Sequence, residues 1–431
     1  MKFKYLVFAM ISGILFLSCE KDGDSEKGSG KLARANIGNA EYIYQVTSNG
    51  TTKSTTGVPE YYKINKDGKS EPICIISENG DTLRLTIRKI LELNEDYLYF
   101  NGDFYTDEGQ YRNLLVEKKT EKIYALSDEI QIEDESRFTT DMQGNIYLIN
   151  VYASNGRTVI KINTTNYTTE QYMPDGQNAQ DILIDKNGLC FYVSPTGNKI
   201  KHPSGQIILL NTLIEDFTEY DDNVVQGSDG TIYVVTRRGK EAEGNAVENT
   251  VKIYRIEDAN NEIKATTITT YPVVYQNFNN CFDIGMIRAN HTNNSLLFFT
   301  SPNLYDNETN MNTLYEFDCT NENWKYSEID VSDIMEARET FAAKNAFYFL
   351  SNGRNKITRL DLSGYAISNT TLTGFEIYDV TSTLTANEIS FSGLRFVDGK
   401  NIVGSIDAYG NIKTIMESGD NAKIESLIRL N

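Results

Sequence analysis

The sequence predicts an all-β body built from repeated four-stranded units, on three observations. From about residue 40 onward, short runs rich in Tyr, Ile, Val, Thr and Phe alternate with Gly, Asn and Asp clusters, which is typical of strands joined by turns. No amphipathic helix longer than a few turns is evident among them. One pattern also recurs along the chain: a polar turn, a run of the type x-Ile-Tyr-x-Val, a variable loop and a second apolar run. The chain therefore looks like an array of similar small sheets.

The recurring pattern has the spacing of a closed ring of sheets. It is clearest at residues 144–149 with 159–163, 230–235 with 251–256, and 345–350 with 357–361. The first run of each unit is anchored by one of eight residues: Tyr42, Tyr99, Tyr147, Tyr192, Tyr233, Phe298, Tyr348 and Val403. The intervals run from 41 to 65 residues with a mean near 52, close to the roughly 40–50 residues of a four-stranded propeller blade.

A unit of that size cannot bury both faces of its sheet alone, and packing such sheets around an axis solves the problem. We therefore expect a β-propeller with eight blades, or seven if the terminal units around Tyr42 and Val403 share one blade. The run 424–430 is a candidate to complete the first blade and close the ring. Two tandem β-sandwiches are the main alternative. The regular interval and the lack of a Pro- or Ser-rich linker near the middle argue against them.

Turns within the units carry a family resemblance. Asp141-Met142-Gln143-Gly144 and Asp185-Lys186-Asn187-Gly188 have the form Asp-x-x-Gly, and Ser228-Asp229-Gly230 is a shorter version. These turns resemble those that precede the second strand in NHL-type and related propeller repeats. The resemblance implies the same fold.

The N-terminus has the features of a lipoprotein signal. Lys2 and Lys4 precede an apolar run at 5–17 that is too short to span a bilayer as an ordinary helix. The run ends in Phe16-Leu17-Ser18-Cys19, which resembles the lipobox of bacterial lipoproteins. The resemblance implies cleavage after Ser18, diacylglyceryl attachment to the Cys19 thiol and acylation, for example with palmitate, of the new amino terminus. Two or three acyl chains anchor a protein stably.

Residues 20–30 are polar, acidic and rich in Gly and Ser, which is linker composition. An acidic stretch directly after the lipid cysteine resembles the surface-export signal of Bacteroidetes lipoproteins. The resemblance implies an outer-membrane protein exposed on the cell surface, with a periplasm-facing location as the alternative. We divide the chain into a signal peptide (1–18), a flexible linker (19–38) and a single propeller domain (39–431).

The charge restricts the partners. With 60 acidic against 41 basic residues, the net charge is −19, which argues against a nucleic-acid partner because such binding needs Lys and Arg to displace counterions. Removing Lys2 and Lys4 makes the mature body more acidic still. Anionic head groups repel such a body, so the lipid is the expected membrane contact.

Candidate binding residues lie in the loops that follow the anchors. In a propeller these loops join the second and third strands of a blade and surround the mouth of the central channel. Four are long: 101–112, 195–206, 236–250 and 301–313. Rings, arginines and carboxylates in such loops suit a polar ligand such as a glycan. The candidates are Tyr105, Tyr111, Arg112, His202, Arg237, Arg238 and Tyr305.

Catalytic, metal and cofactor sites are not predicted. Of the two histidines, His202 is expected on the mouth side and His291 on the opposite face, which disfavours a two-histidine site. The chain has no HExxH, GxSxG, SxxK or Walker-type motif. The spacing of Cys74, Cys190, Cys281 and Cys319 fits no zinc motif, and their disulfide pairing is left open. Apolar neighbours predict buried thiols at Cys74 and Cys190.

Two functions fit these observations. The first is a binding or scaffold lipoprotein that presents a propeller loop face to a glycan, peptide or protein partner in the cell envelope. The second is an extracytoplasmic glycan hydrolase or lyase that uses carboxylate and Tyr residues at the propeller channel. We prefer the first, because the second lacks a catalytic motif.

Overall fold

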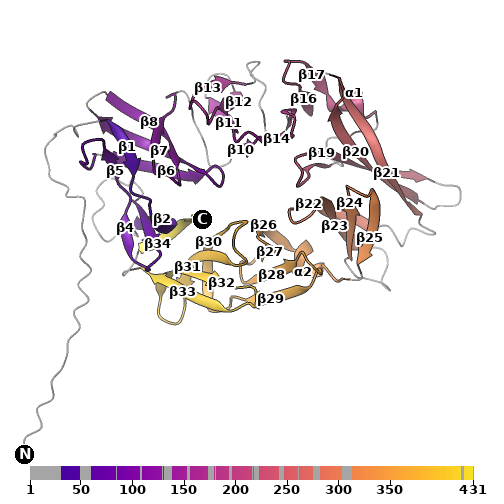
Figure 1. Ribbon diagram of the computed structural model, residues 1–431. Coiled ribbons are helices and arrows are strands. Elements are labelled where there is room, and N and C mark those ends of the chain that lie inside the picture. The colour runs from indigo at the N-terminus through magenta and orange to yellow at the C-terminus, as the bar shows by residue number, and fades with distance from the viewer. Residues whose placement is uncertain are drawn as a thin grey trace, which may run out of the picture.

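The chain folds into eight four-stranded antiparallel sheets arranged in a ring (Figure 1). The computed structural model describes residues 31–430 except 49–59, 84, 107–108, 129, 131–137, 153–155, 173–178, 180, 194–196, 216, 218–222, 242–246, 261, 275–281, 303–312, 328 and 419–421. The arrangement is an eight-bladed β-propeller, which confirms the predicted fold and the larger predicted blade number.

Each blade is named here from its innermost to its outermost strand. Blade 1 consists of β34 (Ala422–Arg429), β2 (Ala40–Ser48), β3 (Glu60–Asn65) and β4 (Ser70–Pro72). Blade 2 consists of β6 (Leu85–Glu92), β7 (Tyr97–Thr106), β8 (Gly109–Glu117) and β9 (Ile123–Ala125). Blade 3 consists of β10 (Phe138–Thr140), β11 (Ile146–Tyr152), β12 (Gly156–Ile162) and β13 (Thr169–Gln171). Blade 4 consists of β14 (Asp181–Ile184), β15 (Cys190–Val193), β16 (Lys199–Lys201) and β17 (Ile207–Leu209).

The second half of the chain continues in the same order. Blade 5 consists of β18 (Asn223–Gln226), β19 (Ile232–Glu241), β20 (Val247–Asp258) and β21 (Ile263–Val274). Blade 6 consists of β22 (Phe282–Asn290), β23 (Ser295–Pro302), β24 (Thr313–Asp318) and β25 (Asn323–Ser327). Blade 7 consists of β26 (Ala337–Ala343), β27 (Ala346–Ser351), β28 (Lys356–Asp361) and β29 (Ile367–Thr371). Blade 8 consists of β30 (Phe375–Ser382), β31 (Ile389–Arg395), β32 (Lys400–Ile406) and β33 (Ile412–Glu417).

The two ends of the chain close the ring by sharing blade 1. Strand β34 pairs antiparallel with β2 from Tyr42↔Arg429 to Ser48↔Ala422, so the last strand is the innermost strand of the first blade. The run at 424–430 therefore completes the first blade, as predicted. The Arg429 guanidinium reaches the Glu388 carboxylate of blade 8 at 2.7 Å, which joins the closing strand to the preceding blade as well.

The anchor residues mark the second strand in seven of the eight blades. The eighth assignment was wrong: Val403 lies in β32, the third strand of blade 8, and the buried Phe391 of β31 takes the corresponding place. The second and third strands are both buried, so Ile402-Val403 after a polar turn has the same local pattern as a second strand. Local alternation alone does not distinguish the two positions.

Eight apolar clusters, one between each pair of neighbouring blades, hold the ring together. Between blades 8 and 1, for example, Val403 packs with Tyr42 and Ile424. The anchors Tyr42 and Tyr99 are completely buried, and burying a large apolar side chain contributes about 1.5–3 kcal/mol. Because each cluster needs residues from two blades, a single blade has no complete core.

Alternating strand directions sort the turns onto two faces. Turns between the second and third strands, and connections from one blade to the next, lie on one side, here called the mouth face. The other turns lie on the opposite face. The Asp-x-x-Gly turns precede the second strands there: Asp141 accepts from the Asn145 N–H at 2.9 Å, and Asp185 from the Leu189 N–H at 2.7 Å. Gly144 and Gly188 close these turns with positive φ angles.

A small additional sheet extends the body on the N-terminal side. Strand β1 (Leu32–Ala35), in the stretch assigned to the linker, pairs with β5 (Ile75–Ser77). The Asn36 side chain accepts from the Cys74 N–H at 2.8 Å and donates to the Pro72 carbonyl at 3.1 Å. The helices α1 (Leu210–Leu213) and α2 (Ser332–Met335) have four residues each. Within the described ranges, no helix has the length and apolarity needed to cross a bilayer.

Candidate functional site

The aromatic residues predicted in the first long loop lie in the β7–β8 hairpin of blade 2. Tyr105 is 38% exposed, whereas Phe104 is buried and Tyr111 packs against the cluster between blades 1 and 2. Arg112 is exposed on β8. Most of the predicted loop 101–112 is therefore strand, and much of its aromatic surface belongs to the core.

His202 lies on the opposite face, so its predicted mouth-side position was wrong. It occupies the turn between β16 and β17, the third and fourth strands of blade 4, and its side chain is only 5% exposed. Its Nδ1 accepts from the Ser204 N–H at 3.0 Å, and its Nε2 lies 3.0 Å from Asp258 Oδ2 of blade 5. The ring therefore bridges two blades. His291 bonds the Ala343 carbonyl of blade 7 and does not meet it.

The structure describes some of the remaining predicted residues and not others. Arg237 and Arg238 lie in β19, opposite Val251 and Thr250 of β20. Tyr305 and Cys19 lie outside the described residues. No group of three or more His, Cys, Asp or Glu in the described ranges is arranged to hold a metal ion.

None of the three described cysteines, Cys74, Cys190 and Cys319, forms a disulfide. Cys190 is completely buried, and burial raises its pKa to about 12. Burial likewise raises the pKa of Cys319 to about 12. Cys74 is half-buried, less enclosed than predicted. Cys281 lies outside the described residues. A thiol with so high a pKa is a poor nucleophile.

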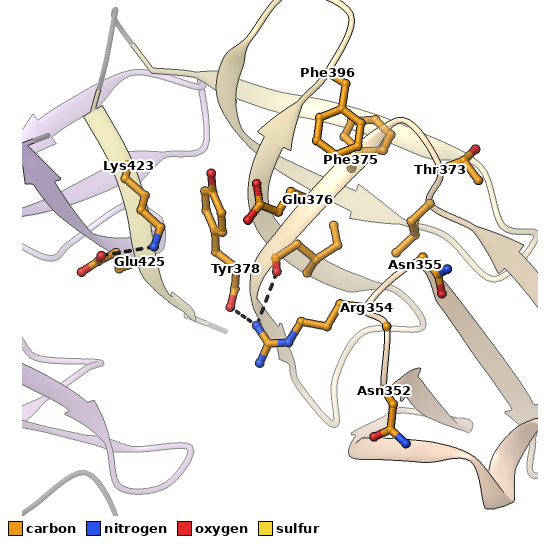
Figure 2. Close-up of a pocket in the computed structure, with 13 residues that line it drawn as sticks. Asn352, Arg354, Asn355, Thr373, Phe375, Glu376, Tyr378, Phe396, Lys423 and Glu425 are labelled. Carbon is orange, nitrogen blue, oxygen red and sulfur yellow. Dashed lines mark hydrogen bonds and ion pairs between the residues drawn. The ribbon is translucent and has the colours of Figure 1, made fainter.

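The structure reveals a pocket on the mouth face, where blades 7, 8 and 1 meet (Figure 2). Its volume is about 850 Å³. Its walls come from the turn between β27 and β28, the connection from β29 to β30, the first residues of β30, the turn between β31 and β32, and the start of β34. The lining residues are Asn352, Gly353, Arg354, Asn355, Leu372, Thr373, Phe375, Glu376, Ile377, Tyr378, Phe396, Lys423 and Glu425.

Arg354 fastens blade 7 to blade 8 at the edge of the pocket. Its guanidinium donates to the carbonyls of Ile377 at 3.4 Å and Tyr378 at 2.5 Å, as Figure 2 shows. It also pairs with Glu339 of β26 at 2.7 Å. Arg354 has a φ of 51°, and such a left-handed residue costs of order 1 kcal/mol or more. The contacts to β30 hold this unfavourable backbone in place.

On the other side of the pocket, a cation lies over an aromatic ring. The ammonium of Lys423 is 4.6 Å from the centre of the Tyr378 ring and 3.4 Å from Glu425 Oε1. Burial, followed by the negative charge of Glu376, raises the pKa of the Tyr378 phenol. The phenol therefore stays protonated at neutral pH and is available as a hydrogen-bond donor.

Two phenylalanines form the apolar wall. Phe375 is half-buried and packs edge-on against Phe391, with ring centres 5.7 Å apart. Phe396 is 57% exposed in the turn between β31 and β32. Arg395 and Asp398, paired at 2.5 Å, brace this turn, and Arg395 also reaches Glu417 of β33. An exposed ring on a braced turn is ready to stack against a ligand.

Sequence reasoning missed this pocket because its turns are short. The sequence signal that was available is Phe396-Val397, an exposed apolar pair in a turn where polar residues are expected. The other lining residues come from three different blades, and only ring closure brings them together.

Comparisons with known proteins yield likeness at low identity only. No protein-family model and no curated protein matches the sequence. Among solved structures, the chain is similar to a streptogramin B lyase with 15% identity and a TM-score of 0.36, over 68% of this chain and 87% of that one. It is similar to virginiamycin B lyase from Staphylococcus aureus with 17% identity and a TM-score of 0.36, over 66% and 86%. It is similar to oligogalacturonate lyase from Vibrio parahaemolyticus with 9% identity and a TM-score of 0.38, over 75% and 99%. The propeller class follows from the sheet order of this chain itself.

Proposed function

We propose that this chain is a lipid-anchored extracytoplasmic binding protein that presents the mouth face of its propeller to a glycan, peptide or protein of the cell envelope. The observation that carries the proposal is the pocket between blades 7, 8 and 1, where aromatic rings, amides and charged groups line one cavity of about 850 Å³. Such a combination of apolar walls and a few polar groups is typical of ligand sites.

Rigidity supports binding. Short turns on packed strands line the pocket, and Arg354 ties the edge strand β30 to blade 7. A wall that is already ordered loses little conformational freedom when a ligand arrives. The pocket is therefore suited to holding a ligand in one orientation.

We propose that Cys19 carries the lipid and that the body lies on the outer surface of the outer membrane. Support comes from the lipobox-like residues 16–19 and from the acidic Gly/Ser-rich stretch that follows. The 12 residues 19–30 span at most about 40 Å when fully extended. This tether is long enough to keep an acidic body away from anionic head groups while its mouth face stays accessible.

A matched pair of glycine variants tests the binding role. A Cβ at Gly374 or at Gly364 meets no atom within 4 Å, and neither glycine has a positive φ. Gly374 lies between the lining residues Thr373 and Phe375, whereas Gly364 lies in a turn on the opposite face. We expect Gly374→Trp to abolish binding to the hits of a glycan and peptide array, while Gly364→Trp leaves binding unchanged.

Turnover assays on the same panel separate binding from catalysis. Ligands that are retained unchanged support the binding proposal. Product release by the wild type that Gly374→Trp abolishes would contradict it and favour the hydrolase or lyase function. Equal binding by both variants would show that the ligand does not use this pocket.

The anchor is tested separately. We expect metabolic labelling with palmitate in the wild type and its loss in Cys19→Ala, with the body released from the membrane. Proteolytic shaving of intact cells should remove the body. Protection from shaving, together with labelling, would indicate the periplasmic side instead.

A further inference from the structure

One carboxylate among the charged residues that line the pocket has no partner among the described residues. Lys423 is paired with Glu425, and Arg354 is paired with Glu339 and two backbone carbonyls. Glu376 is exposed at the start of β30, and its carboxylate has no hydrogen bond or ion pair with any described residue. The two cations are thus engaged by the protein, and the remaining charge is negative.

Aromatic rings line the same pocket as this carboxylate. Figure 2 shows Glu376 between Tyr378 on one side and Phe375 and Phe396 on the other. Glu376 lies close enough to Tyr378 for its charge to influence the phenol. The backbone agrees, because Phe375 pairs with Arg395 across the sheet and the Phe396 N–H donates to the Gly374 carbonyl at 2.9 Å.

A pocket that holds both a carboxylate and aromatic rings suits a cation that carries carbon–hydrogen surface. The carboxylate supplies a charge-assisted hydrogen bond to an ammonium, and ring faces attract the same charge. The net charge of −19 also attracts cations at long range. An anionic ligand, in contrast, would meet the unpaired Glu376 and two cations that are already bonded.

We propose that this pocket recognises a primary amine, with the ammonium on Glu376 and the adjoining carbon skeleton against Phe375 and Phe396. This inference rests on the proposed binding function and names its ligand class. Two sources present this chemistry: an amino sugar with a free amine, or the lysine side chain of a peptide.

Acetylation of the amine supplies the probe, since it removes the positive charge and keeps the skeleton. The full chain, purified in detergent, is titrated calorimetrically in slightly acidic buffer with glucosamine tetramer and its N-acetylated counterpart. Tetralysine with an acetylated N-terminus and the same peptide with its side chains acetylated as well form the peptide arm. We expect the free amine of at least one arm to bind about tenfold or more tightly than its acetylated form.

Two glutamate variants complete the test. Glu376→Gln should abolish the preference for the free amine. Glu262→Gln is the matched control, because Glu262 is also exposed but lies on the opposite face, paired with Lys264 at 3.0 Å. It should keep the preference. Unfolding curves of both variants check that the fold is retained.

Each outcome bears on the inference. A preference in the sugar arm or in the peptide arm supports it and identifies the source. Equal binding of free and acetylated probes, or a preference that survives Glu376→Gln, overturns it. A different outcome is that no amine probe binds, whereas another ligand from the array binds the wild type and not Gly374→Trp. The proposed amine ligand is then wrong, and the proposed binding function is still supported. If no ligand binds at all, the binding function fails as well.

Discussion

Blades 2 and 8 share the same backbone irregularity, yet only blade 8 contributes to the pocket. In each, the innermost strand has a β-bulge, at Arg88 in β6 and at Tyr378 in β30. In each, a glycine of the second strand lies next to the bulge, and a Cβ there would overlap a carbonyl oxygen, of Thr86 at Gly102 and of Glu376 at Gly393. Each bulge adds one residue, Arg88 or Tyr378, whose side chain does not follow the regular alternation of its strand.

The two blades use that side chain differently. In blade 2, Arg88 pairs with Asp103 of the neighbouring strand at 2.5 Å, and the long hairpin places Phe104 in the core. In blade 8, Tyr378 faces Lys423 of blade 1, and the short turn leaves Phe396 exposed. The aromatic rings of the long hairpin in blade 2 thus pack into the core, whereas the short turns where blades 7, 8 and 1 meet enclose a cavity.

The largest expected effect concerns the glycine that lies next to the β-bulge in each of the two blades. Gly102→Ala and Gly393→Ala should each lower the free energy of unfolding by about 2–3 kcal/mol, because the added methyl group meets backbone that cannot move aside. Chemical denaturation measures both. Only Gly393→Ala should also weaken ligand binding. A neutral result at either position would show that the bulge is not constrained by its glycine.

Replacing the arginines contrasts the two blades. Arg354→Met should cost about 2 kcal/mol of unfolding free energy, because two carbonyls and Glu339 lose a charged donor. Arg88→Met should cost less than about 1 kcal/mol, since Arg88 is 60% exposed and its pair is open to solvent. The same denaturation experiment compares them. Equal costs would argue against the bracing role of Arg354.

Removing an exposed aromatic ring from blade 8 or from blade 2 compares the two blades as ligand sites. Phe396→Ala should weaken ligand binding about tenfold, as expected for the loss of one stacking ring, and should leave stability nearly unchanged because the ring is 57% exposed. Tyr105→Ala, at a similarly exposed ring of blade 2, should alter affinity less than about twofold. The reverse order would place the ligand at blade 2, in the first of the four predicted loops.

The smallest effect concerns pH and the turn that carries Phe396. A hydrogen bond from Arg395 lowers the pKa of Asp398, and one from Lys400 lowers the pKa of Glu417. Carboxylates with lowered pKa values stabilise the folded state above their ordinary pKa of about 4, and this contribution is lost as the pH falls through the lowered values. Unfolding curves above and below pH 4 should show a smaller acid loss in Asp398→Asn/Glu417→Gln than in the wild type. An identical loss of stability in acid would show that Asp398 and Glu417 do not contribute to the pH dependence of unfolding.

Strand alternation was sufficient to predict the repeated sheets. Tyr42, Tyr99 and Tyr348 mark second strands because the pattern of each blade is local and each anchor is buried between neighbours. The same locality misplaced Val403, whose third strand is buried in the same way. Most of the predicted loop 101–112 is strand, and whether Tyr111 faces solvent or core depends on the neighbouring blade.

The amino-acid pattern therefore determined the kind of fold, the blade positions and the way the last strand closes the ring, since these depend on contacts between neighbours in sequence or between the two ends. Only the tertiary structure decided where the pocket lies. Asn352, Phe396 and Lys423 stand in turns and strand ends of three blades. Their proximity comes from the packing angle between sheets, which no short stretch of sequence encodes.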